Sequence, residues 1–159
     1  MRITAYVDGS YMEAFKTDGT PCKVYGSGIY ALFEGVLDPV RVSTGGNDPS
    51  IVFMRNVAGE LTAVVSFMNL VKDVCGNDPV DIELYYDYEG VEKWVTGEWR
   101  ANKPATQAYR DFMRDMQKVY SIKFHHVKGH SGVAGNEMAD RLARKGCMDY
   151  AAALGATVR

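Results

Sequence analysis

The chain has 159 residues and a mass of 17.6 kDa, which is the size of one compact domain. Hydrophobic residues make up 47% and charged residues 24% of it, a balance that excludes an intrinsically disordered chain and a collagen-like repeat. Eighteen basic and twenty acidic residues give a net charge of −2, so the surface as a whole is not a general binder of polyanions.

The N-terminal sequence MRITAYVDGS has no apolar run followed by a small-residue cleavage site. We therefore expect neither a signal peptide nor a membrane anchor, no contact with a membrane, and a cytoplasmic protein. The three cysteines, Cys22, Cys75 and Cys147, form no C-x-x-C pair, which argues against a disulfide framework and a zinc site.

Charge is distributed unevenly along the chain. Residues 78–92 contain six acids and no base, whereas residues 100–128 contain seven bases and two acids. Any nucleic-acid contact is therefore expected to be local, on a basic flank beside an acidic centre.

The first part of the chain has strand-like segments followed by one long helix. Residues 3–8 are rich in β-forming residues and end at Asp8, and a polar stretch separates them from two further strands at 24–33 and 40–43. These three segments predict an antiparallel meander. From 55 to 74, apolar residues recur at helical spacing, which predicts an amphipathic helix.

The second part of the chain alternates strands and helices. The pattern predicts a strand that finishes at Asp87, a short helix, a longer helix, a further strand and a last helix, over 80–86, 89–95, 105–119, 121–127 and from 134 onward. We expect one domain over 1–150. Residues 151–159 are small and weakly patterned, so we expect a frayed, flexible tail there.

The order of these elements predicts an α/β sheet. The long helix between the third and fourth strands supplies the crossover that parallel strands require, so the first and fourth strands are expected to be parallel neighbours. The first strand then has an antiparallel neighbour on its other side, and such a position is a switch point at which α/β sheets open a crevice. Asp8 and Asp87 are both expected to face that crevice.

Two further acids are expected to join Asp8 and Asp87. Glu60 stands at the end of an apolar helical stripe, and Asp140 borders the apolar face of the last helix. Each acid alone has an ordinary structural explanation, as a turn, a strand end or a solvated helix residue. Four carboxylates at one sheet end would repel one another, however, and two Mg²⁺ ions would neutralise them, with Mn²⁺ as a substitute. Two such ions are a known device for hydrolysing phosphodiesters.

His130 lies between glycines in the loop that precedes the last helix. A histidine in that place can shuttle a proton or help product release. The ordinary alternative is a histidine on a surface loop.

Four segments of the chain resemble the type 1 ribonucleases H, and most of all their compact bacterial branch. The segments are YVDGS at 6–10, RNVAGEL at 55–61, YYDYEGVEKW at 85–94 and KGHSGVAGNEMADRLA at 128–143. They occur in the order and spacing of the family, from Ile3 to about Cys147. The resemblance implies a ribonuclease H-like α/β fold, with a mixed five-stranded sheet of order 3-2-1-4-5 flanked by helices.

The resemblance also implies an endoribonuclease that cuts the RNA strand of RNA/DNA hybrids by two-metal-ion catalysis and leaves 5′-phosphate and 3′-hydroxyl ends. Asp8, Glu60, Asp87 and Asp140 are then the catalytic, metal-binding carboxylates, which hold two Mg²⁺ ions when substrate is bound. His130 is the auxiliary catalytic residue. We expect a monomer without an obligate protein partner.

Substrate contacts are implied around this centre, at Gly9, Ser10, Arg55, Asn56, Glu89, Trp94, Trp99 and Asn136. The Asn56 amide suits a hydrogen bond to a 2′-hydroxyl, the group that distinguishes RNA from DNA. Arg100, Asn102 and Lys103 would meet phosphates of the DNA strand. For the two tryptophans, core packing is the ordinary alternative.

The sequence departs from the family in two places. After Asp8 it reads SYMEAFKTDGTPCK, without the Gly-Asn-Pro-Gly stretch that supplies a substrate-contacting asparagine, and Met12 or Glu13 stands near that place. The segment between Trp94 and Ala105 is too short for the extra basic helix of longer members. We therefore expect modest affinity with a strong dependence on salt.

Two other classes of protein would share this sheet. A non-catalytic binding module would lack one or more of the acids, and none is missing. A junction resolvase or integrase-like nuclease that acts on DNA would keep the acids, but the GHSG segment followed by Asn136 and Asp140 disfavours it.

Overall fold

The computed structural model describes residues 1–129 and 132–158. Strands, helices and one 3₁₀ turn follow one another along the chain: β1 (Arg2–Lys16), β2 (Pro21–Phe33), β3 (Val40–Gly46), η1 (Val52–Met54), α1 (Asn56–Cys75), β4 (Asp81–Tyr86), α2 (Gly90–Thr96), α3 (Pro104–Gln117), β5 (Ser121–His126), α4 (Ala134–Ala153) and β6 (Ala156–Thr157).

The strands form one mixed sheet of order β3-β2-β1-β4-β5, with the short β6 paired to β1. β1 is antiparallel to β2 and parallel to β4, and β5 is parallel to β4. The long α1 makes the crossover from β3 to β4, as parallel pairing requires. The predicted α/β class and the strand order 3-2-1-4-5 are confirmed.

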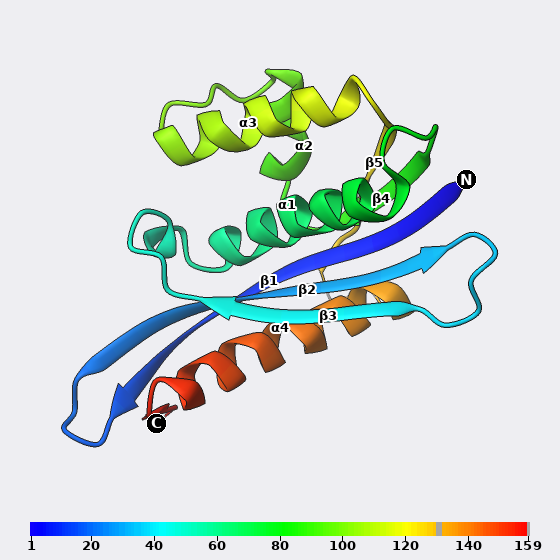
Figure 1. Ribbon diagram of the computed structural model, residues 1–159. Helices are drawn as coiled ribbons and strands as arrows, with labels where there is room; N and C mark the ends of the chain where they lie inside the picture. Colours follow the sequence, from blue (N-terminus) through cyan, green and yellow to red (C-terminus); the bar gives the residue numbers. More distant parts are fainter. Residues whose placement is uncertain (130–131, 159) are drawn as a thin grey trace.

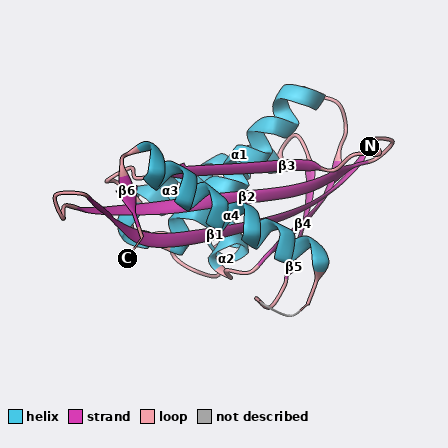
Figure 2. Cartoon of the chain, turned by 90° about the horizontal axis from the view of Figure 1, so that it is seen from below, coloured by secondary structure: helices cyan, strands magenta, loops and turns pink. Residues whose placement is uncertain are grey.

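Helices cover both faces of this sheet (Figure 1 and Figure 2). α1 lies on one face, with α2 and α3 beyond it, and α4 lies on the opposite face along β1, β2 and β3. The main core fills the space between the sheet and α1. Its largest fully buried side chains include Ile3, Ile29, Val64, Phe67, Met68, Val71, Ile82 and Leu84.

Glycines in β2 let α4 lie directly on the sheet backbone. A Cβ atom at Gly26 would be 2.0 Å from the carbonyl oxygen of Ala143, and one at Gly28 would be 2.0 Å from that of Ala139. Any side chain at these two positions would therefore push the helix away. The close approach also brings Asp140, which follows Ala139, to the sheet.

β1 is longer than the sequence predicts, because the polar stretch after Asp8 continues as a strand. Its pairing with β2 runs on to Phe15 and Pro21. A second, smaller core supports this extension, where Ala14 and Val24 pack against Cys147 and Ala151 of α4. Polar residues on one side of the hairpin concealed the strand, since its buried positions are few and small.

Residues 151–157, where a frayed tail was expected, hold the end of α4 and the short strand β6. α4 continues to Ala153, and β6 pairs with the end of β1 through Phe15 and Thr157. Ala156 is only 2% exposed. The small residues of this segment form no periodic pattern in the sequence, but Ala151 and Ala156 pack into the second core beside the extended hairpin.

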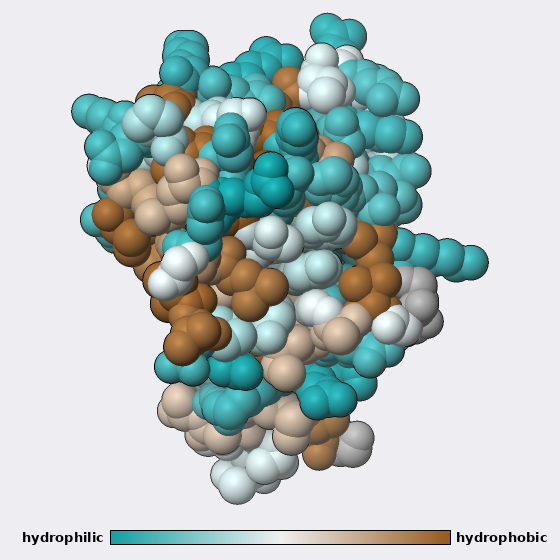
Figure 3. Space-filling view, turned by 90° about the vertical axis from the view of Figure 1, so that its right-hand side faces the viewer, coloured by the Kyte–Doolittle hydropathy of each residue, from teal (hydrophilic) through white to brown (hydrophobic). Residues whose placement is uncertain are grey.

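Among the described residues, no helix has both the length and the apolar composition to span a bilayer. Figure 3 shows one face of the molecule, on which apolar side chains gather in several separate groups with hydrophilic residues between them.

Candidate active site

Asp8 and Asp87 come from neighbouring parallel strands. Tyr6 of β1 and Tyr85 of β4 are in register, so the two acids stand at equivalent positions two residues further along. β4 ends at Tyr86, whereas β1 passes through Asp8 without interruption, because Asp8 is still paired with Gly28. The prediction that both strands stop here holds for β4 only.

Glu60 reaches the same place from the first turns of α1. A Cβ atom at Gly9 would lie 2.1 Å from the carbonyl oxygen of Asn56 and 2.2 Å from the nitrogen of Glu60, so glycine lets the helix start against β1. The Glu60 side chain is 3% exposed, and its Oε2 accepts a hydrogen bond of 2.7 Å from the backbone nitrogen of Tyr88.

Asp140 enters from α4 on the opposite face of the sheet. Its carboxylate pairs with the guanidinium of Arg144, one helical turn further on, at 3.0 Å. Asn136 lies one turn earlier on the same helix and is 4% exposed. α4 therefore presents an acid flanked by a buried amide and an exposed arginine.

Burial and mutual repulsion shift the proton affinities of this cluster. The pKa of Asp8 is raised to about 7, above all by burial and further by Asp140, although hydrogen bonds from the Gly9 nitrogen and from Glu60 oppose the rise. Burial, reinforced by the charges of Asp8 and Asp87, raises the pKa of Glu60 well above its usual range. Burial therefore favours the protonated forms of Asp8 and Glu60, and hydrogen bonds join Glu60 to Asp8 and Asp8 to Asp140.

The cluster has the chemistry of a divalent-cation site but not yet its geometry. In residues 1–129 and 132–158, no three His, Cys, Asp or Glu side chains are already arranged to hold a metal ion. The donors are nonetheless hard carboxylate oxygens, and burial makes their charge costly. A divalent cation would offset that cost in place of protons on the carboxylates, so the residues fit Mg²⁺ or Mn²⁺.

Some of the predicted substrate-binding residues line the cluster. Gly9 and the exposed Asn56 meet where α1 begins, next to Glu60. The side chain of Ser10 lies on the other face of β1, where it hydrogen-bonds the Cys147 thiol. Glu89 is exposed and forms an ion pair of 3.3 Å with Lys93, one turn along α2.

The two tryptophans lie together in an aromatic cluster with Tyr88. Trp94 and Trp99 pack edge to face at 5.7 Å between ring centroids, and each also contacts Tyr88. Both are half-buried, so they combine packing with exposure. A groove of about 320 Å³ begins beside them, lined among others by Trp94, Arg100, Asn102 and Lys103.

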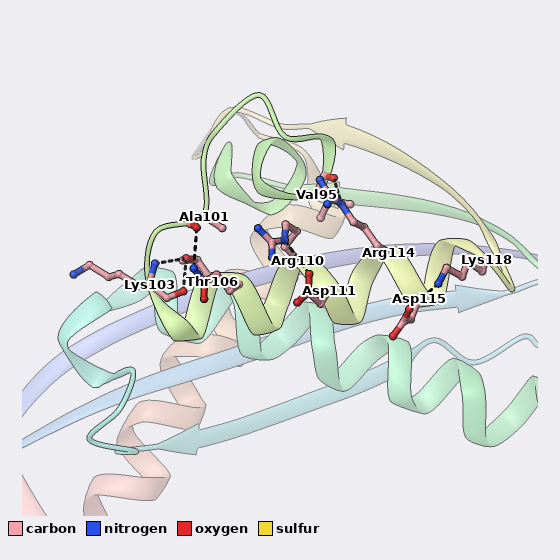
Figure 4. Close-up of polar contacts among 10 residues, drawn as sticks. Val95, Ala101, Lys103, Thr106, Arg110, Asp111, Arg114, Asp115 and Lys118 are labelled. Carbon is pink, nitrogen blue, oxygen red and sulfur yellow. Dashed lines mark hydrogen bonds and ion pairs between the residues drawn. The ribbon is translucent and has the colours of Figure 1, made fainter.

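α3 continues this basic side of the molecule, as Figure 4 shows. Thr106 caps the helix through the backbone of Lys103, and Arg114 donates a hydrogen bond of 3.0 Å to the carbonyl oxygen of Val95. Arg110 and Lys118 pair with the neighbouring acids Asp111 and Asp115. The Arg114 hydrogen bond joins α3 to α2, and the other contacts lie within α3 and at its ends. The exposed Arg100 has no acid paired with it among the described residues.

Sequence reasoning missed the surroundings of Arg55. Its guanidinium lies over the ring of Tyr11, 5.8 Å from the centroid. Arg55 also has φ 58° and ψ −127°, and it is the only non-glycine with positive φ among the described residues. The extended β1 would have had to be predicted before Tyr11 could be placed there. His130 lies outside the described residues.

Comparisons with known proteins identify relatives along nearly the whole chain. The family model for RNase H matches residues 1–148. A ribonuclease H of Brucella anthropi is 29% identical over 157 residues, which cover 91% of this chain and 89% of that protein. A ribonuclease H of Agrobacterium fabrum is 35% identical over 98 residues, covering 55% of this chain and 64% of its relative.

Solved structures with the same fold include other RNase H proteins. RNase H1 of the archaeon Halobacterium salinarum superposes with a TM-score of 0.65 at 24% identity, covering 94% of this chain and 99% of that one. LC11-RNase H1 in complex with an RNA/DNA hybrid gives a TM-score of 0.67 at 16% identity, again over 94% and 99% of the two chains.

Proposed function

The chain belongs to the RNase H family and is a ribonuclease H, and on that basis we propose that it hydrolyses the RNA strand of RNA/DNA hybrids to leave 5′-phosphate and 3′-hydroxyl ends. The observation that carries the proposal is the meeting of four acids from β1, α1, α4 and the end of β4 at one place in the sheet. The hybrid-bound relative of the same fold supports the choice of substrate.

Asp8, Glu60, Asp87 and Asp140 are proposed to hold two Mg²⁺ ions when the hybrid is bound, with Mn²⁺ as a substitute. Bound ions of this kind activate the attacking water and stabilise the leaving oxygen. The chain contributes the placement of the carboxylates. Burial excludes water from Glu60, Asp8 is partly buried beside it, and the Tyr88 nitrogen fixes one oxygen of Glu60. Because the pKa values of both acids are raised, a cation that binds them competes with protons.

The hybrid is proposed to lie across the surface between the start of α1 and the tryptophan cluster. Arg55 and Asn56 suit the RNA strand near the acids, and Trp94 and Trp99 with Arg100, Asn102 and Lys103 suit the DNA strand. Gly9, Ser10, Glu89 and Asn136 complete the proposed substrate-binding set. His130 is proposed as the auxiliary group that moves a proton during turnover.

The enzyme is further proposed to act in the cytoplasm as a monomer without an obligate protein partner. These assignments are predictions from the sequence alone.

Cleavage of matched end-labelled duplexes tests the proposal. RNA/DNA, RNA/RNA and DNA/DNA of one sequence are incubated with Mg²⁺, Mn²⁺ or EDTA, and Asp87→Asn serves as the inactive control. We expect metal-dependent cutting of the hybrid's RNA strand alone. Cutting of DNA would favour a resolvase-like nuclease, and binding of the hybrid without cutting would favour a non-catalytic module.

A further inference from the structure

We propose that Gly129 and His126, at the carboxyl end of β5, are positioning residues that present the carboxylate of Asp87 to a divalent cation. The inference rests on the proposed function, because it assumes that Asp87 ligates metal. It assigns a role to β5, the strand beside β4, although β5 contributes no acid to the cluster.

His126 holds the backbone of Asp87. The last backbone bond between the two strands runs from the nitrogen of Val127 to the carbonyl oxygen of Tyr86, at 2.7 Å. Beyond it, Nε2 of His126 lies 2.6 Å from the carbonyl oxygen of Asp87. A carbonyl oxygen only accepts, so Nε2 is the donor. The imidazole therefore adds one more hydrogen bond between β5 and the chain, at the residue that follows the end of β4.

Gly129 holds the carboxylate itself. Its backbone nitrogen donates a hydrogen bond of 3.0 Å to Oδ1 of Asp87. A Cβ atom at this position would lie 2.8 Å from Oδ2 and 3.3 Å from Cγ of the same side chain. Glycine is thus required for space, since its backbone does not have the positive φ that otherwise favours glycine. The hydrogen bond fixes Oδ1, whereas Oδ2 accepts no hydrogen bond from the described residues.

The two contacts contribute little to the stability of the fold. His126 is exposed on an edge strand, and its ring has one aromatic neighbour, Tyr86, at 5.6 Å. A methyl group at position 129 would press on the flexible end of a side chain rather than on backbone. Changes at either residue should therefore displace Asp87 before they unfold the protein.

The test uses His126→Ala, His126→Gln and Gly129→Ala, with His125→Ala as the matched control. His125 is the neighbouring residue of β5, but it pairs with Glu83 at 3.1 Å instead of touching Asp87. Mg²⁺ affinity is measured by titration calorimetry on the full chain without substrate, alongside the Mg²⁺ concentration that gives half-maximal cleavage of an RNA/DNA hybrid.

We expect His126→Ala and Gly129→Ala to weaken Mg²⁺ binding by about 10- to 100-fold, the usual cost of losing a group that orients a ligand. His126→Gln should restore most of the affinity, because its amide nitrogen can donate to the same carbonyl oxygen. His125→Ala should bind Mg²⁺ as the wild type does. Thermal midpoints measured without metal verify that all the variants are folded. If His126→Ala does not fold, Gly129→Ala provides the test.

Wild-type Mg²⁺ affinity in both His126→Ala and Gly129→Ala would overturn the inference while leaving the proposed function intact. Equally weak binding by His126→Gln and His126→Ala would overturn the hydrogen bond as the cause. A wild-type chain that neither binds Mg²⁺ nor cuts the hybrid would instead contradict the proposed function.

Discussion

Asp8 and Asp87 occupy matching positions on neighbouring parallel strands, yet their surroundings differ in kind. Asp8 sits inside a strand that continues past it, and burial raises its pKa to about 7. Asp87 follows the last residue of its strand, and the backbone nitrogen of Gly129, in the loop after β5, donates to its carboxylate. Asp8 accepts its backbone hydrogen bond from the adjacent Gly9, at 2.9 Å. The two acids therefore differ in the effect of burial and in whether the donor is local or comes from a distant part of the chain.

The difference shows how one site can combine an acid whose charge is disfavoured by burial with an acid whose oxygen is held in a defined place. The negative charge of Asp8 and Glu60 is disfavoured by burial, which raises the pKa of both acids, and a cation would offset that charge. An acid fixed by backbone donors already presents an oxygen at a defined place. Changes on the Asp8 side should therefore alter stability together with activity, whereas changes on the Asp87 side should alter activity alone.

The largest expected effect comes from Asp8→Asn and Asp87→Asn. Each removes a proposed metal ligand, so each should reduce kcat/KM on a hybrid by about 10³-fold or more, which corresponds to several kcal/mol of lost stabilisation of charge. The metal-free thermal midpoint at pH 8 should separate them. Asp8→Asn removes a disfavoured buried charge and should raise the midpoint by roughly 5 °C, whereas Asp87→Asn should leave it nearly unchanged. Near-normal cleavage by either variant would contradict the ligand assignment.

The pH dependence of stability and of cleavage should be governed by the protonation of Asp8. Since the folded pKa of Asp8, about 7, exceeds the usual value near 4, the folded state retains a proton that the unfolded chain releases. The free energy of unfolding without metal should therefore fall as the pH rises from about 4 to about 7. Cleavage should rise by about tenfold per pH unit over the upper part of this range, as the ligands lose protons.

Millimolar Mg²⁺ should raise the thermal midpoint more at pH 8 than at pH 6. The cation competes with protons for the carboxylates of the cluster, and fewer protons are bound at the higher pH. Scanning calorimetry over this pH range, with Asp8→Asn as the control, measures both effects. A thermal midpoint that does not change with Mg²⁺ at any pH would contradict the cluster's role in metal binding.

Gly9→Ala compared with Gly129→Ala should sharpen the contrast between the two sides. At Gly9 the added methyl group meets backbone of α1, so the helix must move and Glu60 with it. We expect a loss of about 1–3 kcal/mol in the free energy of unfolding. At Gly129 it meets only the Asp87 side chain, and stability should hardly change. Equal destabilisation, measured by urea unfolding, would show that the two sides do not differ in this way.

The smallest effect is expected from Arg55→Gly, at the start of the helix that carries Glu60. Glycine relieves the strained backbone with φ 58°, which should raise the free energy of unfolding by about 1 kcal/mol. Loss of the guanidinium should weaken hybrid binding, by up to about tenfold for a contact worth 1.4 kcal/mol. Arg55→Lys, which keeps the charge and the strain, is the control. Unchanged affinity in Arg55→Gly would remove Arg55 from the binding surface.

Local sequence patterns were enough to place most elements and the four acids. Alternation and helical spacing depend on near neighbours, so they indicated the core strands and α1, and the acid after residue 86 marked the end of β4. The same reasoning ended β1 at Asp8 and missed its extension, and it missed the pairing of β6 with β1, because both depend on contacts between distant parts of the chain.

The sequence by itself determined the fold class, the strand order and the identity of the acids, since these follow from periodicity, spacing and family motifs. The tertiary structure decided how each acid is held. Desolvation of Asp8 and Glu60 requires α1 to meet β1 at Gly9, and the hold on Asp87 requires β5 to end beside β4. Burial and hydrogen-bond direction arise only when these surfaces meet, so no stretch of the chain carries them alone.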